Sequence, residues 1–247
     1  LTKLGLRRPE RIVTDRVQVI LIQLHGKNVH VIHVYGVPND NTNTTRKQAM
    51  KVMQATRTII DELETKGKEF FISGDLNWLA GDDDKITVHK GNKGQVKLEF
   101  GLKCDRRPWH GNNGVGAILT SQGIGVCRVQ PKQSKAMLDI MDDETFKRKH
   151  HLDTHGMREL ERELRDSFTF KGPRIKGAGF KESYVVENLD QVYASPNIVA
   201  MGASTTYELP LSFSYRNGAS TGVSDHNMIK FMWNQKGRRN EWPRKVR

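Results

Sequence analysis

Two β-favouring runs of residues, 17–24 and 29–35, stand next to each other near the start of the chain. The second is largely β-branched, with His side chains interleaved, and the polar stretch His25-Gly26-Lys27-Asn28 separates it from the first. Apolar β-branched runs on either side of a short glycine-containing turn are typical of a β-hairpin. The pattern therefore predicts two antiparallel strands.

The next hydrophobic pattern has a helical period. Apolar residues recur at i, i+3, i+4 and i+7 spacing over residues 45–65, and Asn43, Thr44 and Thr45 offer N-caps. Gly67 ends this predicted helix, and a short buried strand is predicted at residues 69–73. A hairpin, a covering helix and a return to a buried strand predict an α/β fold with helices on the outer faces of its sheets.

The middle of the chain has a weaker pattern. Residues 79–165 are interpreted as a long, partly irregular insertion, with short strands at 96–100 and 115–119. Met157, Leu160 and Leu164 stand at helical spacing near its end. Further strands are predicted at residues 167–170, 184–186, 189–194 and 223–233.

Charge narrows the class of partner. The 247 residues include 40 Lys and Arg against 28 Asp and Glu, a net charge of +12. This balance favours a polyanion, with nucleic acid ahead of a membrane surface, although it could also serve solubility alone. The run at 236–247 is interpreted as a basic tail after a single domain at 1–235. Its predicted nucleic-acid-binding residues are Lys236, Arg238, Arg239, Arg244, Lys245 and Arg247.

Cysteine usage and hydropathy exclude other classes. Two cysteines in a chain of this size do not form a disulfide framework, so a reducing, intracellular location is expected. No apolar run approaches the ~20 residues of a membrane span, and no signal-peptide pattern opens the sequence. Because the chain begins at Leu1 without a Met, we expect a fragment or a processed product.

Two polar clusters lie directly beside apolar runs. Gly74-Asp75-Leu76-Asn77 follows Phe70-Phe71-Ile72, and Ser224-Asp225-His226 precedes Met228-Ile229-Lys230-Phe231. A carboxylate at the end of a buried strand is held rigidly, and Asp75 and Asn77 lie on the same side of an extended chain. Acids, an amide and an imidazole placed in this way are the parts of a metal-assisted phosphate-hydrolysing site. The competing interpretation is that each cluster is an ordinary turn or cap.

Two further residues join this list. Asp190 lies inside the apolar run Leu189-Asp190-Gln191-Val192-Tyr193, where an unpaired acid is costly, so we expect a partner such as a His. Tyr35 ends its strand just before a Pro-containing turn. Taken alone, Tyr35 is more simply explained as a core aromatic residue.

The order of these motifs resembles the endonuclease/exonuclease/phosphatase superfamily, which has the DNase-I-like fold. The family's NVYAP, GDFN, IDYIFVS and SDH motifs are similar to the segments His33–Pro38, Gly74–Asn77, Leu189–Ser195 and Ser224–His226. The resemblance covers roughly residues 16–233 and implies a two-sheet sandwich flanked by helices.

The resemblance also implies roles for the residues. Asp75 would deprotonate an attacking water, Asn77 would hold a phosphate oxygen, and Asp190 would align a charged His226 that stabilises the transition state. Tyr35 would contact the phosphate or the leaving oxygen. The implied cofactor is Mg²⁺ or Mn²⁺, since its ligands would be mainly oxygens. The implied metal ligands are Asp75, Asn77, Asp225 and His226.

Members of this family carry an Asn motif and a metal-binding Glu upstream of the Tyr strand, and Glu10 stands in a different context. We therefore expect the fold to be incomplete at the N-terminus, with a longer polyprotein or a second chain supplying the missing strands. Weak or absent activity is expected for the chain alone.

The predicted function is a Mg²⁺-dependent endonuclease of retroelement or apurinic type, acting on DNA rather than RNA, with a nuclear location favoured. The alternatives are a catalytically impaired nucleic-acid-binding module of the same fold and an inositol or lipid phosphatase of the same superfamily.

Overall fold

The structure is a computed structural model of the chain. It describes residues 11–24, 26–38, 42–79, 82–101, 126–129, 134–148, 150–172, 175–177, 180–200, 203–208, 215–216, 219–220, 226 and 228–233.

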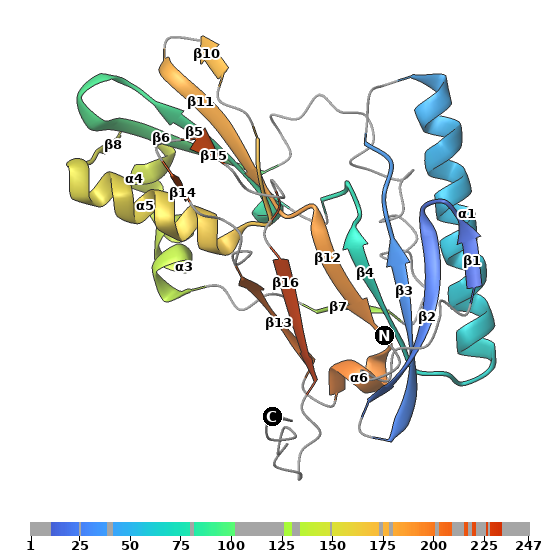
Figure 1. Cartoon of the computed structure of the whole chain (residues 1–247). Coiled ribbons are helices and arrows are strands. Elements are labelled where there is room, and N and C mark those ends of the chain that lie inside the picture. The colour runs from blue at the N-terminus through green and yellow to red at the C-terminus, as the bar shows by residue number, and fades with distance from the viewer. Residues whose placement is uncertain are drawn as a thin grey trace.

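A six-stranded sheet forms the centre of the molecule (Figure 1). The predicted hairpin is confirmed, because β2 pairs antiparallel with β3 from Val17 opposite Val34 to Leu24 opposite Lys27. The strand β3 pairs in parallel with β4, and β4 pairs antiparallel with β12. The strands in order across the sheet are β1 (Arg11–Thr14), β2 (Val17–Leu24), β3 (Lys27–Val34), β4 (Phe70–Asp75), β12 (Asp190–Ala194) and β7 (Cys127–Arg128).

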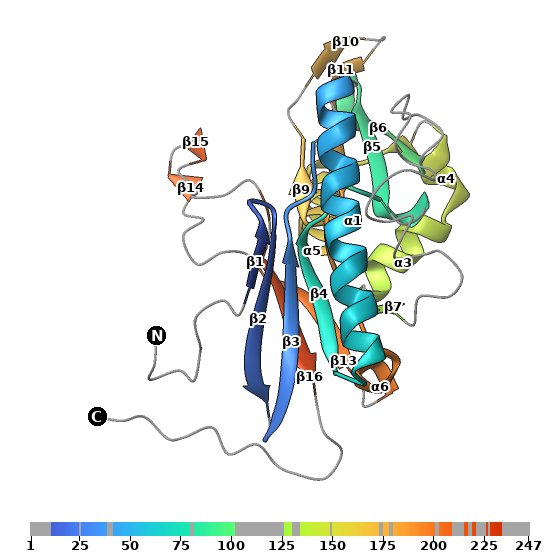
Figure 2. The same cartoon turned by 90° about the vertical axis from the view of Figure 1, so that its right-hand side faces the viewer.

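The helix α1 (Asn43–Thr65) covers one face of this sheet (Figure 2). It begins two residues before the predicted start at residue 45, because the Thr42 hydroxyl accepts a hydrogen bond from the Thr45 backbone N–H at 3.2 Å. Its apolar residues Val52, Ile59 and Ile60 pack on the inward side chains of β2 and β3. The predicted amphipathic helix is therefore confirmed.

The opposite face of the central sheet packs against a two-stranded sheet. Its strands β13 (Ala203–Glu208) and β16 (Met228–Trp233) are antiparallel. The rings of Phe71 and Phe231 stack with centroids 4.7 Å apart, and α6 (Pro196–Ala200) closes the same apolar cluster through Ile198. A strand was predicted at 223–233, and in the described residues it starts at Met228.

A second large sheet lies beside the first (Figure 1). Its antiparallel neighbours are β10 (Ile175–Gly177), β11 (Phe180–Glu187), β5 (Lys85–Lys90), β6 (Gln95–Phe100) and β8 (His150–His151), and β9 (Phe170–Lys171) also pairs with β11. Short elements complete the described chain: 3₁₀ turns at Asp82–Asp84 and Asn92–Gly94, and the strand pair β14 (Tyr215–Arg216) and β15 (Ala219–Ser220).

Helices α3 (Lys135–Asp142), α4 (Glu144–Lys147) and α5 (Thr154–Ser167) pack against the second sheet. Leu160 and Leu164 of α5 are buried against Val88 and Tyr184 of the sheet, as their helical spacing predicts. Much of the range interpreted as an insertion therefore builds the core, because β5, β6 and α5 all come from it.

The predicted strand at 167–170 is wrong at its start, since Ser167 ends α5 and the strand begins at Phe170. The predicted strand at 115–119 lies outside the described residues. The two-sheet α/β architecture is confirmed. Within the described part of the chain, no helix is long and apolar enough to cross a membrane.

Candidate active site and metal centre

Two carboxylates meet where the central sheet pairs β4 with β12. Asp75 is the last residue of β4 and Asp190 is the first of β12, and the two stand directly opposite each other in the ladder. Directly opposed residues of an antiparallel pair project their side chains to the same side of the sheet. The register alone therefore brings together two acids that are far apart in the sequence.

His226 completes the group. Its Nδ1 lies 2.6 Å from the Asp190 Oδ2, within hydrogen-bond distance. Both side chains are mostly buried, with exposed fractions of 22% and 19%. The backbone of His226 forms a β-bridge with Phe170, and the two rings lie 5.1 Å apart, so the imidazole is held from two sides. The expected partner of the buried Asp190 is thus a His.

The three side chains form a possible cation site. Asp75, Asp190 and His226 each offer one ligand atom, and these atoms lie within 4.8 Å of one another. Burial, and after it the negative charge of Asp190, raise the pKa of Asp75 to about 6, against the lowering effect of hydrogen bonds from Asn77 and of the His226 charge. Two adjacent acids that repel each other in this way are a natural place for a divalent cation.

Asn77 holds Asp75 from the following loop. Its backbone N–H donates to the Asp75 Oδ1 at 2.9 Å and its side-chain amide donates to the Oδ2 at 3.0 Å. Asn77 has a φ of +48°, in the left-handed region that Asn tolerates better than most residues. This turned conformation brings the backbone and the side chain of one residue to both oxygens of the carboxylate.

The segment after β3 runs beside this loop. The Gly36 N–H donates to the Asp75 backbone carbonyl at 2.6 Å, and the Asn77 amide donates to the Gly36 carbonyl at 3.3 Å. Arg16 donates to the same carbonyl at 3.1 Å, and its guanidinium lies 4.7 Å from the centre of the Tyr35 ring. Tyr35 is 44% exposed, so its side chain faces solvent and it is not a core aromatic residue.

The structure therefore brings together Asp75, Asn77, Asp190 and His226 of the predicted site, and it places the Tyr35 backbone alongside. Two groups of predicted residues lie outside the described residues. These are the metal ligand Asp225 and the tail residues Lys236, Arg238, Arg239, Arg244, Lys245 and Arg247.

Sequence reasoning missed three residues that support the site. Thr169 accepts a hydrogen bond from the Asp190 N–H at 3.1 Å, Arg16 contacts Tyr35 as described above, and Gln191 bonds to the loop that follows Asn77. A signal existed only for Gln191, as a polar residue within an apolar strand. Arg16 and Thr169 look like ordinary turn residues until the fold is known.

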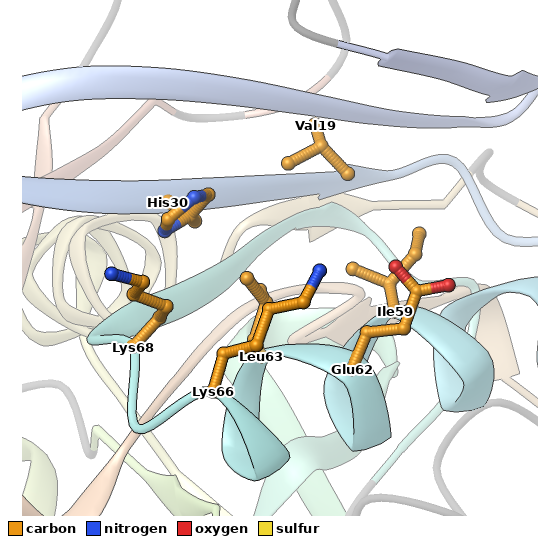
Figure 3. Close-up of a pocket in the computed structure, with 7 residues that line it drawn as sticks. All are labelled: Val19, His30, Ile59, Glu62, Leu63, Lys66 and Lys68. Atoms are coloured by element: carbon orange, nitrogen blue, oxygen red, sulfur yellow. The ribbon is translucent and has the colours of Figure 1, made fainter.

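A separate concavity of about 390 Å³ lies between α1 and the β2–β3 hairpin (Figure 3). His30 in its wall pairs with Phe70, the first residue of β4, so this concavity lies at the opposite end of that strand from Asp75. Among its described lining residues Glu62 is the one carboxylate. The concavity thus lacks the paired acids of the Asp75 cluster.

No protein-family model matches the chain, and no curated protein matches it. The chain is similar to solved structures at low identity. Truncated TDP2 of Caenorhabditis elegans has a TM-score of 0.43 and 13% identity, covering 91% of this chain and 64% of that one. D. rerio TDP2, solved with a single-strand DNA product, has a TM-score of 0.43 and 12% identity over 93% and 68% of the two chains.

The 3'-5' exonuclease NExo of Neisseria Meningitidis has a TM-score of 0.40 and 15% identity, covering 89% of this chain and 65% of that one. The chain spans 64%, 50% and 49% of the three C. elegans TDP2 chains it matches. The two sheets, and the meeting of Asp75, Asp190 and His226 from three separate motifs, agree with the arrangement that the sequence resemblance implies.

Proposed function

We propose that this protein is a divalent-metal-dependent phosphodiesterase that acts on nucleic acid, with DNA as the favoured substrate. The observation that carries the proposal is the cluster of Asp75, Asp190 and His226, whose ligand atoms lie within 4.8 Å of one another. Two acids, an imidazole and an adjacent amide are the groups that hydrolysis of a phosphodiester requires.

Asp75 is the proposed general base. Its pKa is raised to about 6, so near neutral pH it is ionised and still basic enough to accept a proton from water. Asn77 is the proposed anchor for a non-bridging phosphate oxygen, although its amide bonds to Asp75 and Gly36 in the free protein. Substrate would therefore compete for that amide, and Tyr35 would contact the phosphate from the exposed side.

His226 is the proposed cationic stabiliser. The Asp190 carboxylate, 2.6 Å from its Nδ1, favours the protonated imidazole and leaves Nε2 to face the substrate. A positive charge held in a mostly buried position stabilises the negative charge that develops on the phosphoryl oxygens. Asp190 thus acts through His226 as a positioning residue.

The donor set suits a hard divalent cation. The carboxylate oxygens of Asp75 and Asp190 would supply the ligands, because a protonated His226 has no free lone pair for a metal, and oxygen ligands favour Mg²⁺ or Mn²⁺ over Zn²⁺. The raised pKa of Asp75 supports the same assignment, because a cation would relieve the repulsion between the two carboxylates. When bound, such a cation neutralises phosphate charge and polarises the phosphoryl oxygen.

Nucleic acid is the proposed substrate because of charge. A net charge of +12 favours a polyanion. Binding of a DNA oligonucleotide should weaken as salt rises, and deletion of residues 236–247 should weaken binding and flatten the salt dependence. Binding that is equal at low and high salt would contradict this assignment.

The test is cleavage of a labelled DNA duplex in Mg²⁺, compared with cleavage in excess EDTA. We expect weak Mg²⁺-dependent nicking that the Asp190→Asn variant reduces further, because an amide no longer charges and orients His226. The Asp166→Asn variant is the matched control, since Asp166 is an exposed acid on α5.

If the wild-type chain binds DNA without cleaving it under any of these conditions, the binding-module alternative replaces the enzyme. Equal cleavage by wild type and Asp190→Asn would instead show that the reaction takes place elsewhere on the protein.

A further inference from the structure

Gln191 is a buried amide next to the candidate active site. It follows Asp190 in β12, and successive strand residues point to opposite sides of a sheet, so its side chain points away from the acid cluster. It is 3% exposed and stands opposite Gly74, the residue before Asp75. A buried amide is costly unless all of its hydrogen-bonding groups are satisfied.

The Gln191 side chain bonds to three places at once. Its Nε2 donates to the backbone carbonyl of Trp78 at 2.7 Å and to that of Asn188 at 2.9 Å. Its Oε1 accepts a hydrogen bond from the Tyr193 hydroxyl at 2.8 Å. Both amide hydrogens and the carbonyl oxygen of this side chain are therefore in use.

The two carbonyls belong to the two segments that carry the site. Trp78 directly follows Asn77, the left-handed residue that donates to both Asp75 oxygens. Asn188 comes two residues before Asp190 and is itself fixed, because its N–H donates to the Asp84 carbonyl at 2.9 Å. A single amide thus ties the loop behind Asp75 to the turn in front of Asp190.

We propose that Gln191 is a positioning residue that fixes the distance between the Asp75–Asn77 pair and the Asp190–His226 pair. This inference rests on the proposed phosphodiesterase function, because it assigns Gln191 a part in that reaction. Without the Gln191 side chain, the two segments are joined by the backbone bonds of the β4–β12 ladder and by the bond from the Leu76 N–H to the Leu189 carbonyl at 2.9 Å. Beyond Leu76 the loop turns away from the ladder, and the Gln191 amide holds it there.

The experiment replaces Gln191 by Met, which keeps the length and removes the donors. We expect kcat to fall on the order of 10-fold to 100-fold, since small displacements of reacting groups are costly, with KM changed by less than about twofold. The Tyr193→Phe variant removes only the donor to Oε1 and keeps both amide donors, so its kcat should stay near that of wild type.

A second readout does not need activity. The side-chain amide of Asn77 gives its own resonances in a ¹H–¹⁵N NMR spectrum, and these should shift in Gln191→Met as the loop loses its tether. The control is Val96→Ala, a fully buried residue of the second sheet, which lowers thermal stability without touching the loop. Its Asn77 resonances should not move.

The inference is overturned if a folded Gln191→Met protein keeps the kcat and the Asn77 resonances of wild type, whatever its melting temperature. If wild type itself cleaves nothing, the proposed function fails. The Asn77 resonances then decide separately whether Gln191 positions the loop.

Discussion

Asp75 and Asp190 stand opposite each other at the end of a β-ladder, where the charge of Asp190 raises the pKa of Asp75. The sheet holds both in place, so the repulsion cannot be relieved by moving apart. Within the described part of the chain, the pKa of Asp75 is lowered in compensation by the Asn77 hydrogen bonds and the His226 charge. This strain within the free protein has consequences for its response to pH and to cations.

The first prediction concerns pH and stability without metal. The pKa of Asp75 is about 6 in the folded protein against an ordinary 3.8, so folding favours the protonated acid. The stabilisation is complete below pH ~4 and is lost as pH rises through ~6. At pH 7 in EDTA, Asp75→Asn should therefore be more stable than wild type by on the order of 1 kcal/mol, after allowance for partial solvent screening.

Thermal unfolding at a series of pH values checks this directly. The difference in Tm between Asp75→Asn and wild type should be larger at pH 7 than at pH 4.5. A difference that shrinks as pH rises would mean that Asp75 is stabilised in its ionised form.

The second prediction concerns cations. Mg²⁺ or Mn²⁺ should raise the Tm of wild type at pH 7 and EDTA should reverse the effect. Bound ligand at ten times its Kd stabilises by about 1.4 kcal/mol, which corresponds to a few degrees for a chain of this size. Asp75→Asn should lose most of this increase, whereas Asp61→Asn, an exposed acid of α1, should keep it. An equal increase in both variants would place the cation elsewhere.

The third prediction concerns Gly36. A Cβ added there would lie 1.9 Å from the Leu76 carbonyl oxygen, which is backbone and cannot move without displacing the loop of Asn77. Gly36→Ala should therefore cost about 1–3 kcal/mol of stability and lower any cleavage activity more than Tm alone explains.

Gly156→Ala is the matched control for this prediction, because the atoms nearest its added Cβ are side-chain atoms of Asp153 and Leu152 at 3.3 Å or more. The free energy of unfolding of both variants, measured by chemical denaturation, should fall more for Gly36→Ala than for the control. Equal losses of stability would show that contact with the Leu76 carbonyl is not the cause.

Much of the central sheet could be predicted because its residues repeat simple local patterns. The hairpin and α1 each bury one regular apolar face, so periodicity located them within two residues. The second sheet was harder to predict. Its strand β5 begins with Lys85, which is buried and paired with Glu187 at 3.1 Å, and a buried ion pair looks like a solvated turn in sequence.

The candidate site also contains residues that could be predicted from the sequence and residues that could not. Asp75, Asp190 and His226 were recognisable because each lies beside or inside an apolar run, where an acid or imidazole is unusual. The residues that support the site could not be recognised in the sequence. Gln191 and Arg16 donate hydrogen bonds to the backbone carbonyls of Trp78 and Gly36. Side-chain bonds to distant backbone leave no residue pattern, because every residue offers the same carbonyl.

The last prediction concerns His226. Replacing it by Ala removes a cation that stabilises charge mainly in the transition state, so kcat for Mg²⁺-dependent DNA cleavage should fall on the order of 10²–10³, with a smaller change in KM. His226→Gln keeps hydrogen-bonding capacity and cannot carry a charge, so it should be nearly as damaging as Ala. His155→Ala is the control, since that side chain is 78% exposed on α5.

The hydrogen bond between His226 and Asp190 allows a second test with a double variant. If His226 works as a cation held by Asp190, then Asp190→Asn and His226→Ala should not be additive, because each removes the same charged unit. The double variant should be about as active as His226→Ala alone. Full activity in His226→Ala, or losses that multiply in the double variant, would show that the pair does not act as one unit and that the Asp190–His226 contact at 2.6 Å is structural.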